Sequence, residues 1–150
     1  MSNLNSIQND IVLQDILQAH KRIQTYIYHT PLEFSEKFSS LYGMDIYLKM
    51  ENLQITGSFK AWGAFNRILT LNDTERKCGV IASSAGNHGI SLAYAAKMLN
   101  ASAHVYLPND ADLSKIDSIE RHGALIKYFD SIEDARLSAL NASKEDGNIF

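Results

Sequence analysis

Lys60 lies at a position in the sequence where its amine could react with a bound ligand. It follows Gly57 and Ser58, between an alternating segment at 46–50 that is typical of a strand and a helical pattern from about 60 to 71. In α/β proteins, ligands bind at such strand-to-helix junctions. Gly57 permits a tight turn and Ser58 can cap the helix, which puts Lys60 in the first turn, where the helix dipole disfavours an extra cation. A neutral amine there would attack an aldehyde, although most lysines are solvated surface residues.

A second segment, Ser83-Ser84-Ala85-Gly86-Asn87-His88-Gly89, follows an apolar strand pattern and opens another helical pattern. Free backbone N–H groups at a helix start favour an anion such as a carboxylate or a phosphate. Ser84 and Asn87 add side-chain donors. A plain turn capped by serine or asparagine explains the segment alone at least as well.

Thr56-Gly57-Ser58-Phe59-Lys60, followed by Gly63-Ala64, and Ser84-Ala85-Gly86-Asn87-His88 occur together in this chain. The first resembles the lysine motif, and the second the substrate loop, of the fold-type II pyridoxal-phosphate (PLP) enzymes of the serine/threonine dehydratase (threonine ammonia-lyase) family. The resemblance runs from about Val12 to Phe150 in the family's order and spacing. Further matches are Thr30-Pro31-Leu32, Tyr47-Leu48-Lys49, Glu51-Asn52, Pro108, Lys115 and Gly123-Ala124.

The resemblance implies a role for each matched residue. Lys60 would be the Schiff-base lysine of PLP and would shuttle the substrate's α-proton. Phe59 would pack against the cofactor ring, and Asn87 would hydrogen-bond its phenolic oxygen. The loop formed by Ser84, Ala85, Gly86, Asn87 and His88 would bind the substrate, with the carboxylate held by Ser84, Gly86 and His88. The implied reaction is β-elimination of L-threonine or L-serine to a 2-oxo acid and ammonia, with PLP as electron sink.

The loop also narrows the choice within the family. Asn87 followed by His88 resembles dehydratases and serine racemases, whereas cysteine synthases usually have threonine there. Racemases place a second serine before the glycine of this loop as an acid/base, and Ala85 occupies that position here. Because alanine cannot carry a proton, elimination is favoured over racemisation. Trp62 replaces the arginine of many relatives and Ile90 replaces their glutamine, so altered packing around the loop is expected.

Two parts of the family's site have no counterpart within the 150 residues. In these enzymes a glycine-rich loop that cradles the phosphate and a residue, often serine, that pairs with the pyridine nitrogen lie beyond residue 150. The chain is therefore expected to be an amino-terminal half that is inactive alone, with exposed apolar faces over its first ~70 residues. The alternatives are a truncated, non-catalytic remnant that binds a partner or a small amino acid, and a half-enzyme that a second chain completes.

The elements that must position these segments alternate along the chain. Apolar residues at 12, 16, 19, 23 and 27 predict an amphipathic helix that Asn9 or Asp10 can cap, and Phe34, Phe38 and Leu41 predict a short helix ended by Gly43. Later helices at about 60–71, 88–99, 113–122 and 131–147 alternate with strands at 79–82, 103–107 and 125–129, and with the start of a strand at 148–150. This order predicts an α/β fold with an open parallel sheet and flanking helices.

The resemblance makes this fold an incomplete tryptophan synthase β-like PLP fold. Residues 1–75 would be the N-terminal segment of the large PLP-binding domain and carry the Schiff-base lysine. Residues 76–150 would be the small α/β domain and carry the substrate loop, and the remainder of the large domain would be absent. A full-length protein would be a homo-oligomer acting on a small amino acid.

Composition excludes several other functions. The net charge is −3 without a basic block, which disfavours nucleic acid and anionic membranes as partners. No apolar run reaches the roughly 18–20 residues of a membrane span, and the N-terminus has no signal-peptide pattern. The single cysteine, Cys78, cannot form an internal disulfide, and these features together favour the cytoplasm. The histidines at 20, 29, 104 and 122 lack metal-ligand spacing, so no metal is expected.

Overall fold

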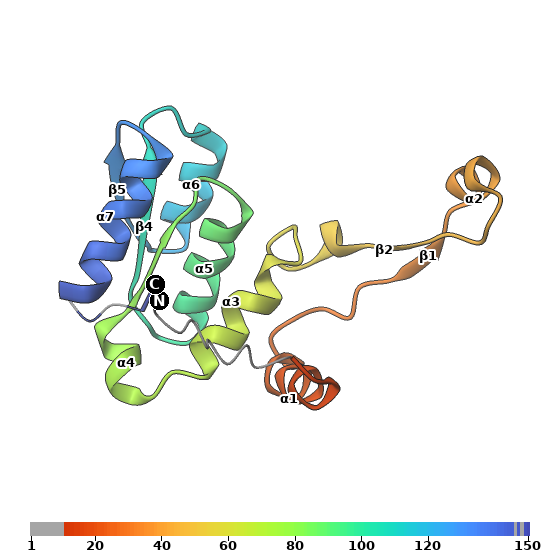
Figure 1. Cartoon of the computed structure of the whole chain (residues 1–150), viewed down its shortest axis with the longest axis horizontal. Coiled ribbons are helices and arrows are strands. Elements are labelled where there is room, and N and C mark those ends of the chain that lie inside the picture. Colours follow the sequence, from red (N-terminus) through yellow and green to blue (C-terminus); the bar gives the residue numbers. More distant parts are fainter. Residues whose placement is uncertain (1–10, 146, 148) are drawn as a thin grey trace, which may run out of the picture.

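A three-stranded parallel sheet with the order β3-β4-β5 lies at the centre of the fold. The structure is a computed structural model, and it describes residues 11–145, 147, 149 and 150. The strands are β3 (Val80–Ser83), β4 (Ala103–Pro108) and β5 (Leu125–Phe129). Helices α5 (Asn87–Met98) and α6 (Leu113–Arg121) lie on one side of the sheet and α7 (Ile132–Glu145) on the other (Figure 1). The predicted α/β fold with an open parallel sheet is confirmed.

The strands are paired in a register that aligns their carboxyl ends. Val105 of β4 pairs with Ala82 of β3 on one side and with Ile126 of β5 on the other. At the outer edge of β3, Ile149 forms a parallel bridge with Val80, which agrees with the predicted start of a strand there. Asn148, which was part of that prediction, lies outside the described residues.

Two groups of buried apolar side chains hold the layers together. The larger group fills the space between α3 (Lys60–Leu69), α5, α6 and the sheet, and the smaller one lies under α7. At the contact of α3 with α5, the ring of Phe65 stacks on Tyr26 and meets Tyr94 edge-on, with centroids 5.1 and 6.0 Å apart. Such aromatic contacts fix the position of α3 beyond what area burial alone provides.

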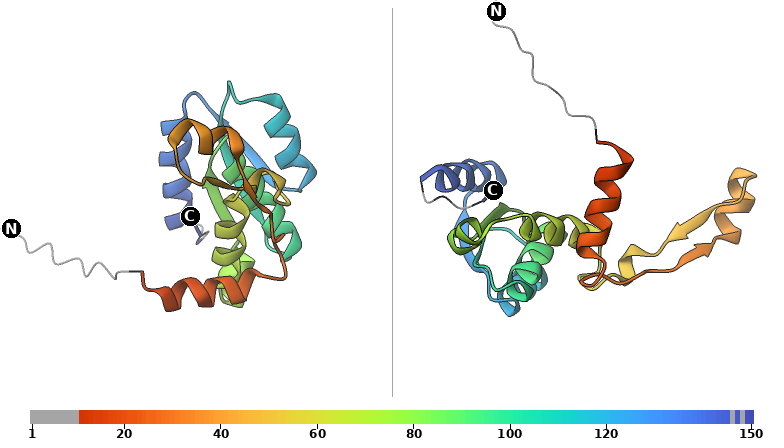
Figure 2. Two further views of the ribbon diagram at one scale, coloured as in Figure 1. Left: turned by 90° about the vertical axis from the view of Figure 1, so that its right-hand side faces the viewer. Right: turned by 90° about the horizontal axis from the view of Figure 1, so that it is seen from below.

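The segment before α3 has little contact with the sheet. Helix α1 (Leu13–Ile23) packs on α3, and β1 (Leu32–Phe34), α2 (Glu36–Tyr42) and β2 (Tyr47–Lys49) form an arm that projects from the rest of the molecule (Figures 1 and 2). Strands β1 and β2 pair antiparallel. The expected apolar exposure is confirmed by Ile11, Leu13, Ile16, Leu17, Leu32, Phe34, Leu41, Tyr42, Met44 and Tyr47.

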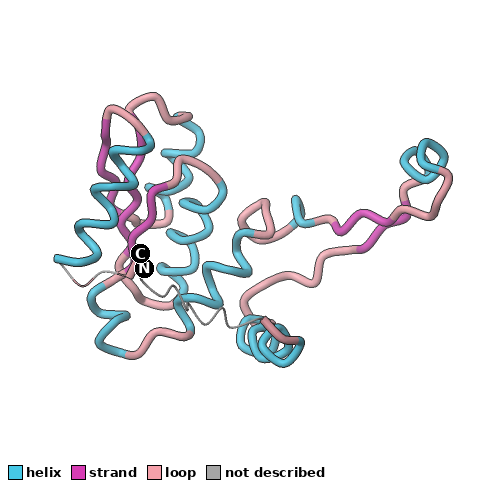
Figure 3. Tube along the Cα trace, in the orientation of Figure 1, coloured by secondary structure: helices cyan, strands magenta, loops and turns pink. Residues whose placement is uncertain are grey.

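Several element boundaries differ from the predictions. Figure 3 shows the helices, strands and loops along the chain. Helix α1 ends at Ile23 rather than near Ile27, because the chain turns there and Gln54 holds both backbone groups of Tyr28. Phe34 lies in β1 and not in the short helix, since its strand pairs with the distant β2. Helix α4 (Asp73–Cys78) was not predicted; it rests on a capping box between Asn72 and Glu75 rather than on apolar periodicity. The proposed caps Asn9 and Asp10 lie outside the described residues.

A 3₁₀ turn, η1 (Glu51–Leu53), follows β2 and leads into the segment that carries Lys60.

In the described part of the chain, no helix has the length and apolar character needed to cross a membrane.

Candidate active site

Lys60 is the first residue of α3, as the sequence predicts for the first turn. Gly57 has a φ of 71°, the left-handed conformation that favours glycine, and so turns the backbone into the helix. Phe59 rather than Ser58 is the N-cap residue, and the Ser58 hydroxyl accepts the backbone N–H of Lys60 at 3.4 Å. The Lys60 amine lies 5.0 Å from the centroid of the exposed Phe59 ring.

The predicted substrate loop joins the carboxyl end of β3 to the first turn of α5. Gly86 is the N-cap residue of α5, and the Ser84 hydroxyl accepts the backbone N–H of Gly86 at 3.4 Å. Gly89 in the first turn has no room for a side chain, because an added Cβ would lie 2.4 Å from the Ser84 carbonyl oxygen. The loop therefore rests directly on the helix that it opens.

A partly buried hydrogen bond joins the segment 56–60 to α5, the helix that the predicted substrate loop opens. The hydroxyl oxygens of Thr56 and Ser91 lie 2.8 Å apart, and Ser91 is fully buried in α5. Together with the packing of α3 on α5, this contact sets the distance between the two segments.

One cavity of 610 Å³ brings part of the predicted site together. It is lined by Lys49, Glu51, Phe59, Lys60, Trp62, Gly63 and His88. The cavity thus brings together Phe59 and Lys60 of the lysine motif and His88 of the predicted substrate loop. The loop residues 84–87 precede His88 and are not among the lining residues of this cavity.

The surroundings of His88 favour its neutral form. Desolvation by the surrounding protein, followed by the positive charge of Lys60, lowers the pKa of His88. Both effects penalise the protonated imidazole. The ring is therefore held in its neutral form near pH 7.

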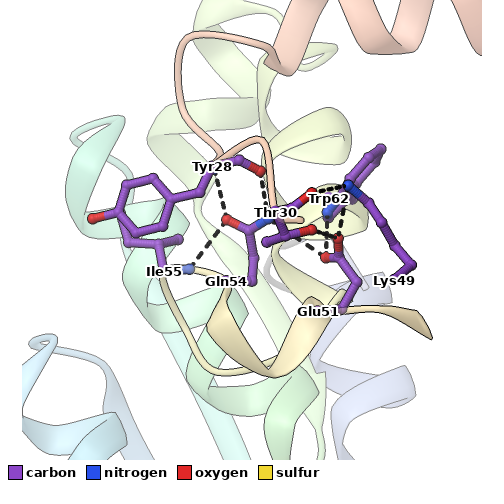
Figure 4. A network of polar contacts seen from close by, with 7 residues as sticks. All are labelled: Tyr28, Thr30, Lys49, Glu51, Gln54, Ile55 and Trp62. Atoms are coloured by element: carbon purple, nitrogen blue, oxygen red, sulfur yellow. Dashed lines mark hydrogen bonds and ion pairs between the residues drawn. The ribbon is translucent and has the colours of Figure 1, made fainter. Parts of the chain in front are cut away.

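A polar network is centred on Glu51 and includes Lys49 and Trp62, which also line the cavity (Figure 4). The Thr30 hydroxyl, the Trp62 indole N–H and the Gln54 amide donate to the Glu51 carboxylate at 2.6, 2.8 and 3.4 Å. The Lys49 amine lies 4.0 Å from Glu51. Burial alone would raise the pKa of Glu51, but these hydrogen bonds and the charge of Lys49 hold it below its ordinary value.

Sequence reasoning did not propose four of the lining residues as site residues. Lys49, Glu51 and Gly63 matched the family pattern, and Trp62 was interpreted as a packing residue. The signal that could have found Lys49 and Glu51 is their opposite charge, two residues apart beside the lysine motif.

Comparisons with known proteins agree with this geometry. The sequence profile of the family described as "Pyridoxal-phosphate dependent enzyme" matches residues 23–150. An L-threonine ammonia-lyase of Thermotoga maritima is 41% identical over 141 residues, which is 93% of this chain and 35% of that protein. A serine racemase of Dictyostelium discoideum is 41% identical over 128 residues, covering 85% of this chain and 40% of the relative.

The crystal structure of the serine racemase from Dictyostelium discoideum superposes with a TM-score of 0.85 at 38% identity, covering 93% of this chain and 46% of that chain. The chain spans 34–41% of the length of the first eight curated relatives that it matches. The chain belongs to the pyridoxal-phosphate-dependent enzymes of fold type II. Within them it falls in the group that contains threonine dehydratases, serine racemases and hydroxyaspartate ammonia-lyases.

The residues around the cavity fit the family's cofactor. An accessible primary amine at Lys60 suits an aldehyde, and the exposed ring of Phe59 beside it suits an aromatic heterocycle. The 610 Å³ cavity falls within the roughly 300–1,000 Å³ of small-molecule sites. For metal ions, no cluster of three or more His, Cys, Asp or Glu side chains occurs among the described residues.

Proposed function

We propose that this chain provides the reactive lysine and the substrate loop of a PLP-dependent ammonia-lyase acting on L-threonine or L-serine. The observation that carries the proposal is that Lys60, Phe59 and His88 line the same cavity. The overall reaction converts the hydroxy amino acid into a 2-oxo acid and ammonia: water is first lost across Cα and Cβ, and hydrolysis then releases ammonia.

Each residue has a defined task in this proposal. PLP, when bound, draws electrons from Cα and so makes the α-proton acidic. The Nζ atom of Lys60 would hold the cofactor's aldehyde carbon and later move the α-proton. Phe59 would contact the ring and Asn87 the phenolic oxygen. Lys60 is well placed for both tasks because it lies at the start of α3 and lines the same cavity as His88.

The substrate carboxylate would bind at the start of α5. The backbone N–H groups of a helix start favour an anion, and the Ser84 hydroxyl lies next to them. Ser84, Ala85, Gly86, Asn87 and His88 form the proposed substrate-binding segment. The neutral ring of His88 adds no positive charge beside the Lys60 amine.

Elimination is preferred to racemisation for this chain because the position before Gly86 is alanine. Ala85 has no group that could return a proton to the opposite face of Cα. In the same proposal, residues 1–75 belong to a large domain, residues 76–150 form a small domain, and the full-length protein is a homo-oligomer.

The experiment uses the chain as it is. PLP is added, borohydride fixes any lysine adduct, and peptide mass spectrometry locates the label. We expect the label on Lys60, its loss in Lys60→Arg, and its retention in the control Lys37→Arg, which changes an exposed lysine of α2. A label spread evenly over the lysines would contradict the proposal.

Product analysis tests the reaction itself. The isolated chain is expected to form no 2-oxo acid from L-threonine or L-serine, since it spans only 34–41% of the relatives' length. In a protein of the relatives' full length that contains this chain, 2-oxo acid should form. D-serine as the main product would overturn the preference for elimination.

A further inference from the structure

Trp62 lies between the cavity of the candidate site and a neighbouring cavity. It is the single tryptophan of the chain and lies in the first turn of α3, two residues after Lys60. It lines the Lys60 cavity and also a neighbouring cavity of 280 Å³ with His20, Gln24, Ile27, Tyr28, His29 and Lys49. Trp62 and Lys49 are therefore the wall that the two cavities share.

The indole of Trp62 forms a hydrogen bond with a carboxylate in addition to its packing contacts. Its N–H donates to Glu51 at 2.8 Å, across the loop that carries the lysine motif. The Glu51 side chain is only 17% exposed, so this bond to a charged acceptor is largely shielded from water. Hydrogen bonds to charged groups are about twice as strong as those between neutral groups.

The start of the same loop is held by further hydrogen bonds. Gln54, which is buried, accepts the backbone N–H of Tyr28 at 2.8 Å and donates to the Tyr28 carbonyl at 3.0 Å. Thr30, also buried, donates to Glu51. The carboxylate thus joins the segment before β1, the turn η1 and the helix α3 at one point (Figure 4).

Lys60 itself depends on this arrangement for its position. Its side chain is exposed and contacts the ring of its neighbour Phe59, so the place of its amine in the cavity follows from the place of the first turn of α3. We propose that Glu51 and Trp62 are positioning residues that hold this turn, and with it the Lys60 amine, against the cavity. This inference rests on the proposed role of Lys60 as the lysine that holds PLP.

The bond between the pair is tested first, without any cofactor. A chain with one tryptophan gives one indole N–H signal in a proton–nitrogen NMR spectrum. Glu51→Gln keeps an acceptor oxygen but removes the charge, and Glu51→Ala removes both. We expect the indole proton signal to move upfield in Glu51→Gln and further in Glu51→Ala. An unchanged signal in both variants would show that the bond does not exist.

The positioning role is tested by where PLP labels the chain after borohydride reduction. The readout is the ratio of label on Lys60 to label on the exposed Lys97 of α5. We expect Trp62→Phe and Glu51→Ala to lower this ratio about tenfold, as expected for the loss of one hydrogen bond to a charged group. Trp62→Arg, which restores a donor to Glu51, should recover most of it, and the control Arg67→Gln, on the same helix, should leave it unchanged.

The outcomes separate this inference from the proposed function. A general loosening of the fold would lower the ratio in Trp62→Arg as much as in Trp62→Phe, whereas the positioning role predicts recovery in Trp62→Arg. If the wild-type chain shows no preference for Lys60, the proposed function fails, and the positioning role for that lysine fails with it. If the wild-type preference persists unchanged in Trp62→Phe and Glu51→Ala, the positioning inference fails while the proposed function stands.

Discussion

At the scale of single residues, His88 reports the electrostatics of the candidate site. Its pKa is lowered by desolvation first and by the charge of Lys60 second. His122 of the α6 end behaves similarly, with desolvation lowering its pKa and Lys97 and Arg121 adding to the effect. In both cases the folded chain binds a proton less readily than the unfolded chain.

The order of the two causes at His88 gives a prediction. Replacing the charged amine in Lys60→Met should raise the pKa of His88, but not to its ordinary value, because the larger cause remains. The measurement is an NMR titration of the His88 ring. A full return to the ordinary value would show that the charge of Lys60, and not desolvation, dominates.

The same shifts set the direction of the pH dependence of stability. Because the folded-state pKa values of His88 and His122 lie below those of the unfolded chain, their contribution is complete above the ordinary histidine pKa of 6.5. It is lost as the pH falls from there through the lower folded-state values. The melting temperature should therefore fall below pH 6.5, and less so in His122→Gln. A melting temperature that rises over this range would contradict the assignment.

At the scale of elements, two helix glycines have opposite roles. Gly89 lets α5 approach the substrate loop, since a Cβ there would lie 2.4 Å from the Ser84 carbonyl oxygen. Gly63 lies in α3 with open space around it. Packing therefore requires glycine at position 89, whereas Gly63 makes α3 less stable than an alanine at that position would.

Substituting each glycine by alanine tests this difference. Gly89→Ala should lower the free energy of unfolding by about 1–3 kcal/mol, because the loop backbone must move. Gly63→Ala should raise it by about 1 kcal/mol, the gain of alanine over glycine inside a helix. Urea denaturation of both variants measures the two effects. Changes of the same sign would show that the loop does not rest on α5 as described.

At the scale of the whole molecule, stability is unevenly distributed. The sheet and the helices around it share a buried core, whereas the arm of β1, α2 and β2 has two strands of three residues and mostly exposed side chains. Two-stranded hairpins are at best marginally stable alone in water. The arm is therefore held by local hydrogen bonds and not by the core.

Amide hydrogen exchange should reveal this division. Residues 32–49 should exchange much faster than the central strands at 80–83 and 103–108, because local opening costs least where few apolar contacts form. The experiment is repeated at two protein concentrations. Equal protection of the arm and the central strands at the lower concentration would contradict the prediction.

The amino-acid sequence by itself determined the α/β class, the place of Lys60 at the start of a helix, and the loop after a buried strand. These features depend on local periodicity, glycine positions and helix starts, which act over a few residues. Only the tertiary structure decided which distant side chains meet. Thr56 forms a hydrogen bond with Ser91, which lies 35 positions away in the sequence. Glu51 accepts hydrogen bonds from Thr30 and Trp62, which lie 21 and 11 positions away. Such contacts depend on how helices and loops pack in space, which no local pattern encodes.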